Sequence, residues 1–112
     1  MQRDRLFVIE MIDSAARIVD LVGTDPVEAL TADRTRLDAV LWNYTVLGEA
    51  AARLTEETRA AHPEIPWRLP AALRNRVVHG YWSIDVDVLH STAVLELPRL
   101  ADQLRAVRDA LD

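Results

Sequence analysis

The residues best suited to chemistry lie in one short stretch, Arg74–Tyr81, which reads RNRVVHGY. Four residues separate Arg74 from His79, and Tyr81 follows two positions later. A histidine exchanges protons near neutral pH, and an arginine holds a phosphate through its planar fork of donors. Without a metal cage, this pair suits the attack of a ribose 2′-OH on its neighbouring phosphate. The stretch therefore predicts cleavage of RNA.

The other histidines have plainer explanations. His62 precedes Pro63 and is typical of a polar turn, while His90 is expected on a solvated helix surface among charged neighbours. The chain has no cysteine, which excludes disulfides, thiolate zinc sites and thiol nucleophiles. We therefore predict neither a metal site nor a cofactor.

Neighbours of the stretch could assist it. Asn75 could orient the phosphate or the imidazole, while Arg76, Arg68 and Trp67 offer charge and a stacking face for a single strand. From spacing alone, an ordinary basic helix end with a packed histidine explains the same residues. Tryptophans more often belong to a core or an interface than to an RNA platform, and the chain has three: Trp42, Trp67 and Trp82.

One regular helix does not bring Arg74 and His79 together. Five residues turn a side chain by about 500°, which leaves the two about 140° apart. The helix could end at His79 with Gly80 as its left-handed C-terminal residue, so that the imidazole swings. Alternatively, two copies could meet across a twofold axis and line one cleft with Arg and His from both chains. We favour the second arrangement, with the first contributing.

Helices are predicted for all the elements that position this stretch, since Ala, Leu, Arg and Glu fill the segments between scattered Gly and Pro. A helix over about 3–22 ends at Gly23, and Asp25-Pro26 predicts an N-cap followed by proline at the first helical position. Thr55 predicts a cap for a short segment, and Pro98 a kink in the last helix. The other helices are expected over about 26–30, 33–54, 66–79 and from 85 onward.

The apolar stripes of these helices predict an all-α, antiparallel bundle of four to five helices. In the segment 33–54, the small residues of Gly48–Ala52 (GEAAA) would let another backbone come close. The inner stripe of that helix is Leu37, Val40, Leu41, Tyr44, Leu47, Gly48 and Ala51, and that of the last helix is Val86, Leu89, Ala93, Leu97, Leu100, Leu104, Val107 and Leu111.

The composition limits the number of domains, the location and the kinds of partner that we expect. The 112 residues, half of them hydrophobic and 28% charged, indicate one globular domain over residues 1–112, of a size that often dimerises. No apolar run is long enough to span a bilayer, and the N-terminus does not read as a signal peptide, so we expect a cytoplasmic protein with no membrane partner. The net charge of −5 argues against a broad basic face for duplex DNA but leaves RNA open.

Two segments resemble the HepT-like branch of the HEPN superfamily: PEIPWR…LRNRVVHGYWSID (63–85) and RTRLDAVLWNYTVLGEAAARL (34–54). The resemblance runs from about Asp4 to Leu111 and includes the proline of the last helix. The superfamily signature is Arg, four to six residues, then His, which Arg74–His79 satisfies with four. A longer form adds any residue and Tyr, matched by Gly80-Tyr81. The bare signature is unspecific. It becomes specific when it stands among the neighbouring sequences PWR, LRN and HGY, with GEAA one helix earlier.

The resemblance implies a dimeric, metal-independent ribonuclease that acts as the toxin of a toxin–antitoxin pair. Arg74 and His79 map to its catalytic residues. Antitoxins of this branch resemble minimal nucleotidyltransferases of the MntA kind and silence the toxin by attaching AMP to the motif tyrosine, which maps to Tyr81. AMP there would place bulk and negative charge where the RNA phosphate must sit. Tyr81 could instead be a half-buried aromatic residue that closes the loop over the bundle.

Some alternatives remain open. Glu49 lies on a helix expected to face the motif and could pair with Arg74, or it could form a surface or capping salt bridge. The chain could also be a non-catalytic HEPN module that binds or regulates a nucleotidyltransferase, or a purely structural helical dimer. An intact R-x4-H-x-Y favours the enzyme, because a scaffold needs neither Arg nor His. The low basic charge suits a narrow target, such as a tRNA end or a particular message.

Overall fold

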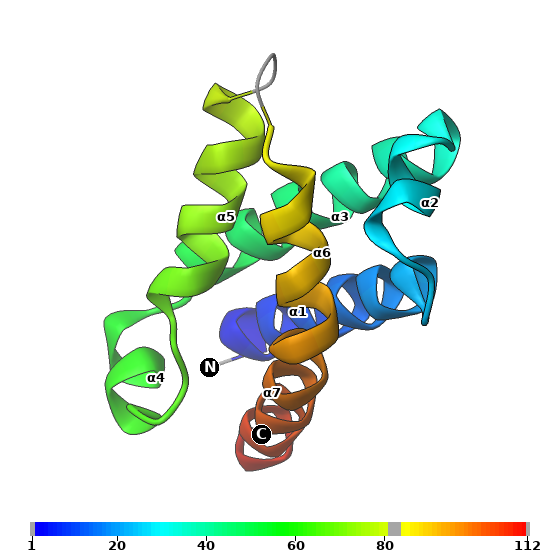
Figure 1. The fold of residues 1–112 in the computed structure, drawn as a ribbon. Helices are drawn as coiled ribbons and strands as arrows, with labels where there is room; N and C mark the ends of the chain where they lie inside the picture. Colours follow the sequence, from blue (N-terminus) through cyan, green and yellow to red (C-terminus); the bar gives the residue numbers. More distant parts are fainter. Residues whose placement is uncertain (1, 81–83, 112) are drawn as a thin grey trace.

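Helices make up the regular structure of the computed structural model, which describes residues 2–80 and 84–111 (Figure 1). Within that part of the chain there is no strand, so the predicted all-α fold is confirmed. The helices are α1 (Gln2–Val22), α2 (Val27–Thr31), α3 (Arg34–Ala52), α4 (Glu56–Ala61), α5 (Arg68–His79), α6 (Val86–Leu95) and α7 (Leu97–Ala110).

The core forms where α1 packs against α3 and α7, and α5 packs mainly against α3. In Figure 1, α6 and α7 form a column that crosses α1, and α5 rises beside α6. Burial removes the apolar stripes of these helices from water, which is the main force holding the bundle together. Fully buried members include Met11, Ile18, Tyr44, Leu47, Leu89, Leu97 and Leu104. None of the described helices is long and apolar enough to cross a membrane.

Helix boundaries follow local chemistry. Gly23 ends α1 with a φ of +57°, a conformation that glycine adopts without steric cost. The side chains of Asp33, Thr55 and Asp85 each accept a hydrogen bond from a backbone N–H in the first turn of the following helix. These caps explain why α3, α4 and α6 begin close to the predicted positions.

The predicted start of α2 is wrong by one residue. Pro26 is itself the N-cap, the helix begins at Val27, and Asp25 makes no capping hydrogen bond. The Asp25 carboxylate instead accepts a hydrogen bond of 2.9 Å from Arg36, whose guanidinium also donates to the carbonyl oxygens of Leu21 and Val22. This competing partner draws the carboxylate away from the helix end.

The kink predicted at Pro98 takes the form of a one-residue interruption at Glu96, between α6 and α7. The Glu96 N–H still donates to the Thr92 carbonyl oxygen at 2.9 Å, and Pro98 lies in the first turn of α7. Proline has no N–H to donate, and its ring clashes with the carbonyl of the residue four positions earlier, so a continuous helix through Val94 and Pro98 is disfavoured. The buried stripe nevertheless continues from Leu89 in α6 to Val107 in α7.

Asp4 joins the beginning of α1 to the beginning of α4. Its buried carboxylate accepts hydrogen bonds from the backbone N–H of Thr55 (3.1 Å), the Thr55 hydroxyl (2.6 Å) and the Thr58 hydroxyl (2.5 Å). Burial alone would raise the pKa of Asp4, but these hydrogen bonds hold it below its ordinary value of 3.8. A charged carboxylate is thus retained inside the fold.

Candidate active site

Gly48 allows α5 to lie directly against α3. A Cβ atom at this position would come to 2.7 Å from the carbonyl oxygen of Pro70 and would collide with the Cβ of Arg74. Real Cβ atoms do not make contacts this short, so only glycine permits the approach. The close contact predicted for the small residues of Gly48–Ala52 is confirmed, and its consequence is that Arg74 is pressed against α3.

Two side chains hold the guanidinium of Arg74. Nη2 lies 2.5 Å from the Glu49 carboxylate on α3, and Nη1 donates to Asn75 Oδ1 at 2.9 Å. Nε is buried and has no hydrogen-bond partner among the described residues. The Arg74 side chain remains 33% exposed. The pairing of Glu49 with Arg74 is confirmed, and the guanidinium is oriented from both terminal nitrogens while one part of it still meets solvent.

His79 is the last residue of α5, and its side chain is exposed. Because α5 is one continuous helix through Arg74 and His79, the two side chains leave it about 140° apart, with Arg74 on the flank that meets Glu49. Within one chain, the described structure therefore does not direct the two side chains toward one another.

The left-handed conformation expected at Gly80 is wrong. Its φ is −105°, and its N–H donates to the Arg76 carbonyl oxygen at 3.0 Å, which completes the last turn of α5. Glycine is favoured for another reason, since a Cβ here would come to 2.7 Å from that same oxygen. Tyr81 and Trp82 lie outside the described residues. The two-copy arrangement stays a prediction.

The remaining predicted residues lie along α5 and immediately before its first residue. Asn75, Arg76 and Arg68 are exposed, as a strand-binding role requires. Trp67 is half-buried against the core, and its indole N–H is shared by the carbonyl oxygens of Arg59 and His62 at 3.1 and 3.0 Å. Trp67 thus serves the fold, and its stacking on RNA stays a prediction.

Neither of the other histidines changes this view. His62 Nδ1 lies 3.6 Å from the Glu64 carboxylate in the turn before α5. His90, expected on a solvated surface, is half-buried, and its Nε2 lies 2.7 Å from the Asp25 carbonyl oxygen, which connects α6 to the loop before α2. Among residues 2–80 and 84–111, no three His, Asp or Glu side chains gather in a way that could hold a metal ion.

Comparison with known proteins identifies the family of this chain. Residues 11–107 match the family described as Ribonuclease HepT-like. The chain belongs to this family. The resemblance predicted from the motif is therefore confirmed. No solved structure compared with the chain matches it significantly.

Several curated proteins are similar to this HepT-like chain. A Thermococcus cleftensis protein named probable ribonuclease HepT is 32% identical over 72% of this chain and 74% of its own length. A Methanocaldococcus jannaschii protein named as a candidate RNase is 24% identical over 84% of this chain and 78% of its own. Another, from Caldanaerobacter subterraneus subsp. tengcongensis, is 22% identical over 96% of both chains.

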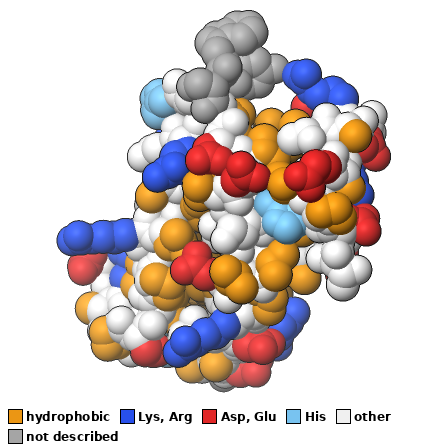
Figure 2. Space-filling model, in the orientation of Figure 1, with side chains coloured by type: hydrophobic (Ala, Val, Ile, Leu, Met, Phe, Trp, Pro, Cys, Tyr) orange, Lys and Arg blue, Asp and Glu red, His pale blue; other side chains and the backbone are white. Residues whose placement is uncertain are grey.

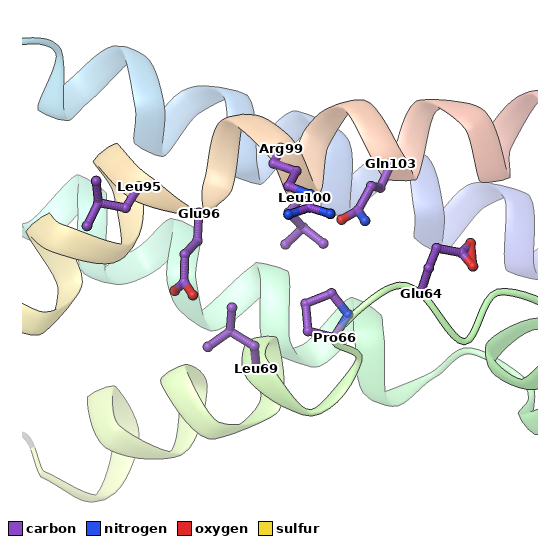
Figure 3. Close-up of a pocket in the computed structure, with 8 residues that line it drawn as sticks. All are labelled: Glu64, Pro66, Leu69, Leu95, Glu96, Arg99, Leu100 and Gln103. Carbon is purple, nitrogen blue, oxygen red and sulfur yellow. The ribbon is translucent and has the colours of Figure 1, made fainter.

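Surface hollows of this HepT-like chain were not predicted from sequence. One groove, of about 390 Å³, lies between α5 and the α6–α7 break, with Pro66 and Leu69 on one side and Leu95 and Leu100 on the other (Figure 3). Another, of about 320 Å³, lies between α1 and α3 and reaches Glu49. The face in Figure 2 intersperses acidic, basic and apolar side chains rather than gathering basic ones in one broad area. Grooves depend on how helices cross, which a stripe on one helix does not specify.

Proposed function

We propose that this HepT-like protein is a metal-independent endoribonuclease whose catalytic residues are Arg74 and His79. The observation that carries the proposal is the pair itself, Arg-x4-His at the end of α5, in a chain of the Ribonuclease HepT-like family. The names of its relatives, which describe ribonucleases, support it. So does the anchored guanidinium of Arg74, because a fixed donor costs less reorganisation when charge develops on a phosphate.

The proposed reaction is a transesterification in which the phosphoryl group moves from the 5′ oxygen of the next nucleotide to the neighbouring ribose 2′ oxygen. A histidine removes the proton of the ribose 2′-OH, and the oxygen attacks the adjacent phosphorus. Arg74 stabilises the negative charge that builds on the phosphoryl oxygens. The bond to the 5′ oxygen of the next nucleotide breaks, and that oxygen takes up a proton. The products are a 2′,3′-cyclic phosphate and a 5′-hydroxyl end. Asn75, Arg76 and Glu49 support phosphate binding, and Arg68 and Trp67 contact the strand.

The active form is a homodimer in this proposal. Arg74 and His79 leave α5 about 140° apart, so one chain does not supply both groups to the same phosphate. Two copies related by a twofold axis would supply an arginine and a histidine from each side. A second histidine would also provide the general acid that protonates the leaving 5′ oxygen.

Regulation is proposed to act on Tyr81. A partner nucleotidyltransferase of the MntA kind would transfer AMP from ATP to the Tyr81 hydroxyl and release pyrophosphate. The pair would form a type VII-like toxin–antitoxin system in the cytoplasm. Incubation with such a partner and ATP should add the mass of AMP to the wild type but not to Tyr81→Phe. Labelling that survives Tyr81→Phe would remove Tyr81 from the proposal.

Expression in cells tests the toxin directly. The wild type should arrest growth and degrade RNA, while His79→Ala and Arg74→Ala should do neither. Arg99→Ala is the control for the loss of an arginine, because Arg99 on α7 is exposed and, unlike Arg74, forms no ion pair among the described residues. If His79→Ala is as toxic as the parent, the ribonuclease proposal fails. If the protein cleaves nothing yet binds a nucleotidyltransferase, the alternative of a regulatory HEPN module is favoured.

A further inference from the structure

Exposed side chains form a row along the outer face of α5. Four members of the row, spaced by four, three and four residues, fall within about 60° of one another around the helix axis. They are Arg68, Ala72, Asn75 and His79, and all of them are exposed. Arg76, which is also exposed, lies about 60° to one side of His79. We call these five residues the α5 tract.

The α5 tract faces away from the rest of the fold. The helix packs mainly against α3, and its buried residues Pro70, Leu73 and Val77 lie on the face opposite the tract. Figure 1 shows α5 along one edge of the molecule, above α4. From Arg68 to His79 the tract is about 16 Å long, at about 1.5 Å per residue. That length matches about five stacked nucleotides of one strand, at about 3.4 Å each.

The α5 tract is cationic although the chain is acidic. Helix α5 holds three arginines and no acidic residue, while the net charge of the whole chain is −5. Within residues 2–80 and 84–111, Arg68 and Arg76 form no ion pair, in contrast to Arg74, which is bound by Glu49. Exposed cations without an internal partner attract an external anion.

The stability of α5 does not explain Arg68. This arginine is the first residue of the helix, where the macrodipole is positive and a second positive charge is unfavourable. Arg76 and His79 lie in the last turn, where the dipole favours a positive charge, so the helix end alone could account for them. An exposed cation at the unfavourable end is better explained by something that the cation binds.

A strand of RNA fits the α5 tract better than a protein segment does. A protein interface is built around a large apolar or aromatic anchor, whereas the middle of the tract is Ala72, which offers one methyl group. Only Val78 of the large exposed apolar side chains belongs to α5, and it lies outside the tract. The set of such side chains among the described residues is Leu6, Trp42, Val78, Val94 and Leu95. A duplex is disfavoured, because it needs a broad basic face and the tract is a single row.

We infer that the α5 tract binds single-stranded RNA along its phosphate backbone, with Arg68 and Arg76 as phosphate contacts and Ala72 as the gap that lets the strand come close. This inference rests on the proposed ribonuclease function and deepens it, since it names the class of RNA and the path by which the strand reaches His79. Nucleotides on one side of the cut, up to about five when stacked, lie along α5. Arg74 is outside the tract, so its guanidinium stays available for the phosphate that is cleaved.

Fluorescence anisotropy tests the arginines. The probe is a labelled, mixed-sequence 2′-O-methyl RNA of about 12 nucleotides, whose blocked 2′ oxygen prevents cleavage. Arg68→Gln and Arg76→Gln should each weaken binding about fivefold. Each should also reduce the slope of log affinity against log salt by about 0.7, the effect of losing one phosphate contact to a single strand. Arg68→Lys keeps the charge and should keep the slope.

Arg5→Gln is the control for these variants, because Arg5 on α1 is exposed and forms no ion pair among the described residues. It should bind the RNA with the wild-type slope. Circular dichroism should show the same helix content in every variant. Arginine variants of the tract that keep the wild-type slope, or a wild type that does not bind the RNA, would overturn the inference.

A charge placed in the gap tests the path of the strand without touching an arginine. Ala72→Glu should weaken binding about fivefold or more, because a carboxylate in the middle of the tract repels the phosphates. Ala106→Glu makes the same change at an exposed position of α7 and should leave the affinity within about twofold of the wild type. Normal binding by Ala72→Glu would contradict the path.

The inference and the ribonuclease proposal can fail separately. If the wild type cleaves RNA and both Arg68→Gln and Ala72→Glu cleave equally well, the tract is wrong and the ribonuclease stands. If the tract variants lose RNA affinity but the wild type cleaves nothing, the ribonuclease proposal fails and the tract stands as an RNA-binding surface. Loss of binding to a nucleotidyltransferase partner, with RNA affinity unchanged, would make the tract a protein interface and overturn the inference.

Discussion

Glu49 and Arg74 are joined by an ion pair of 2.5 Å that links α3 to α5 beside the closest approach of the two helices. Both side chains are partly exposed, 43% and 33%, so water screens the pair and its contribution to stability is small. The effect of the pair on the orientation of the guanidinium is larger, because Asn75 accepts a hydrogen bond from the other terminal nitrogen of Arg74. The pair is better explained by the positioning of Arg74 than by the stability of the fold.

Glu49→Ala should therefore impair cleavage without unfolding the protein. A guanidinium displaced by about 1 Å can cost up to about 100-fold in rate, and we expect a loss of at least tenfold. Glu49→Gln keeps an oxygen that accepts from Nη2 and should retain more activity. Cleavage rates measured beside thermal unfolding check this, with exposed Glu57→Ala as the control. Faster cleavage by Glu49→Ala would mean that Glu49 competes with the phosphate instead.

Gly48→Ala should separate α3 from α5. The added methyl group has no room beside Pro70 and Arg74, and overpacking of this kind costs about 1–3 kcal/mol. The better helix propensity of alanine offsets about 1 kcal/mol at most. Urea denaturation should show lower stability and cleavage assays lower activity. Ala52→Ser, at an exposed position of the same helix, should change stability by less than about 0.5 kcal/mol. Unchanged stability in Gly48→Ala would contradict the close packing.

Asp4→Asn should destabilise the junction of α1 and α4 in a pH-dependent way. The folded pKa of Asp4 is depressed by its hydrogen bonds from Thr55 and Thr58, so its stabilising effect is present above pH 3.8 and is lost as pH falls below it. At neutral pH we expect a loss of about 1–3 kcal/mol. Denaturation of both proteins across the acid range measures this. A difference that stays constant down to pH 2 would contradict the assignment.

Tyr44→Phe should remove a buried hydrogen bond. The Tyr44 hydroxyl is fully buried and donates to the Leu89 carbonyl at 2.7 Å, which ties α3 to α6. Its loss should cost about 1–2 kcal/mol in denaturation experiments. Burial raises the pKa of Tyr44, with Glu96 adding to the effect, so this contribution is present below pH 10 and is lost as pH rises above it. A Tyr44 that ionises reversibly in the folded protein near pH 10 would refute this.

Much of the fold could be predicted because its signals are local. Gly23, Asp33 and Thr55 determine helix ends through their own backbone preferences and caps. Asp25 failed as a cap because Arg36, eleven residues away, binds its carboxylate. Such a competition is decided by tertiary structure and leaves no local pattern.

In the candidate site, too, the features with local signals could be predicted and those decided by tertiary structure could not. The types and spacing of Arg74 and His79, and the small residue at Gly48, were visible in the sequence. Gly80 was misjudged because its φ is negative although its N–H makes the bond to Arg76 that a left-handed cap would also make, and a pattern of residue types does not reveal this. Nor could spacing show that Trp42 and Glu10 border one groove, since that depends on how α1 crosses α3.

Cleavage of a labelled RNA oligonucleotide pool in EDTA, by the wild type and by His79→Ala, tests the central claim most directly. The wild type should cut the RNA and leave 2′,3′-cyclic phosphate ends, and it should leave a 2′-deoxy version intact. His79→Ala, folded and with the same oligomeric state, should be slower by at least about 100-fold, the usual worth of a general acid–base. Equal cutting by His79→Ala, or cutting of the 2′-deoxy strand, would contradict the assignment of His79 and of the reaction.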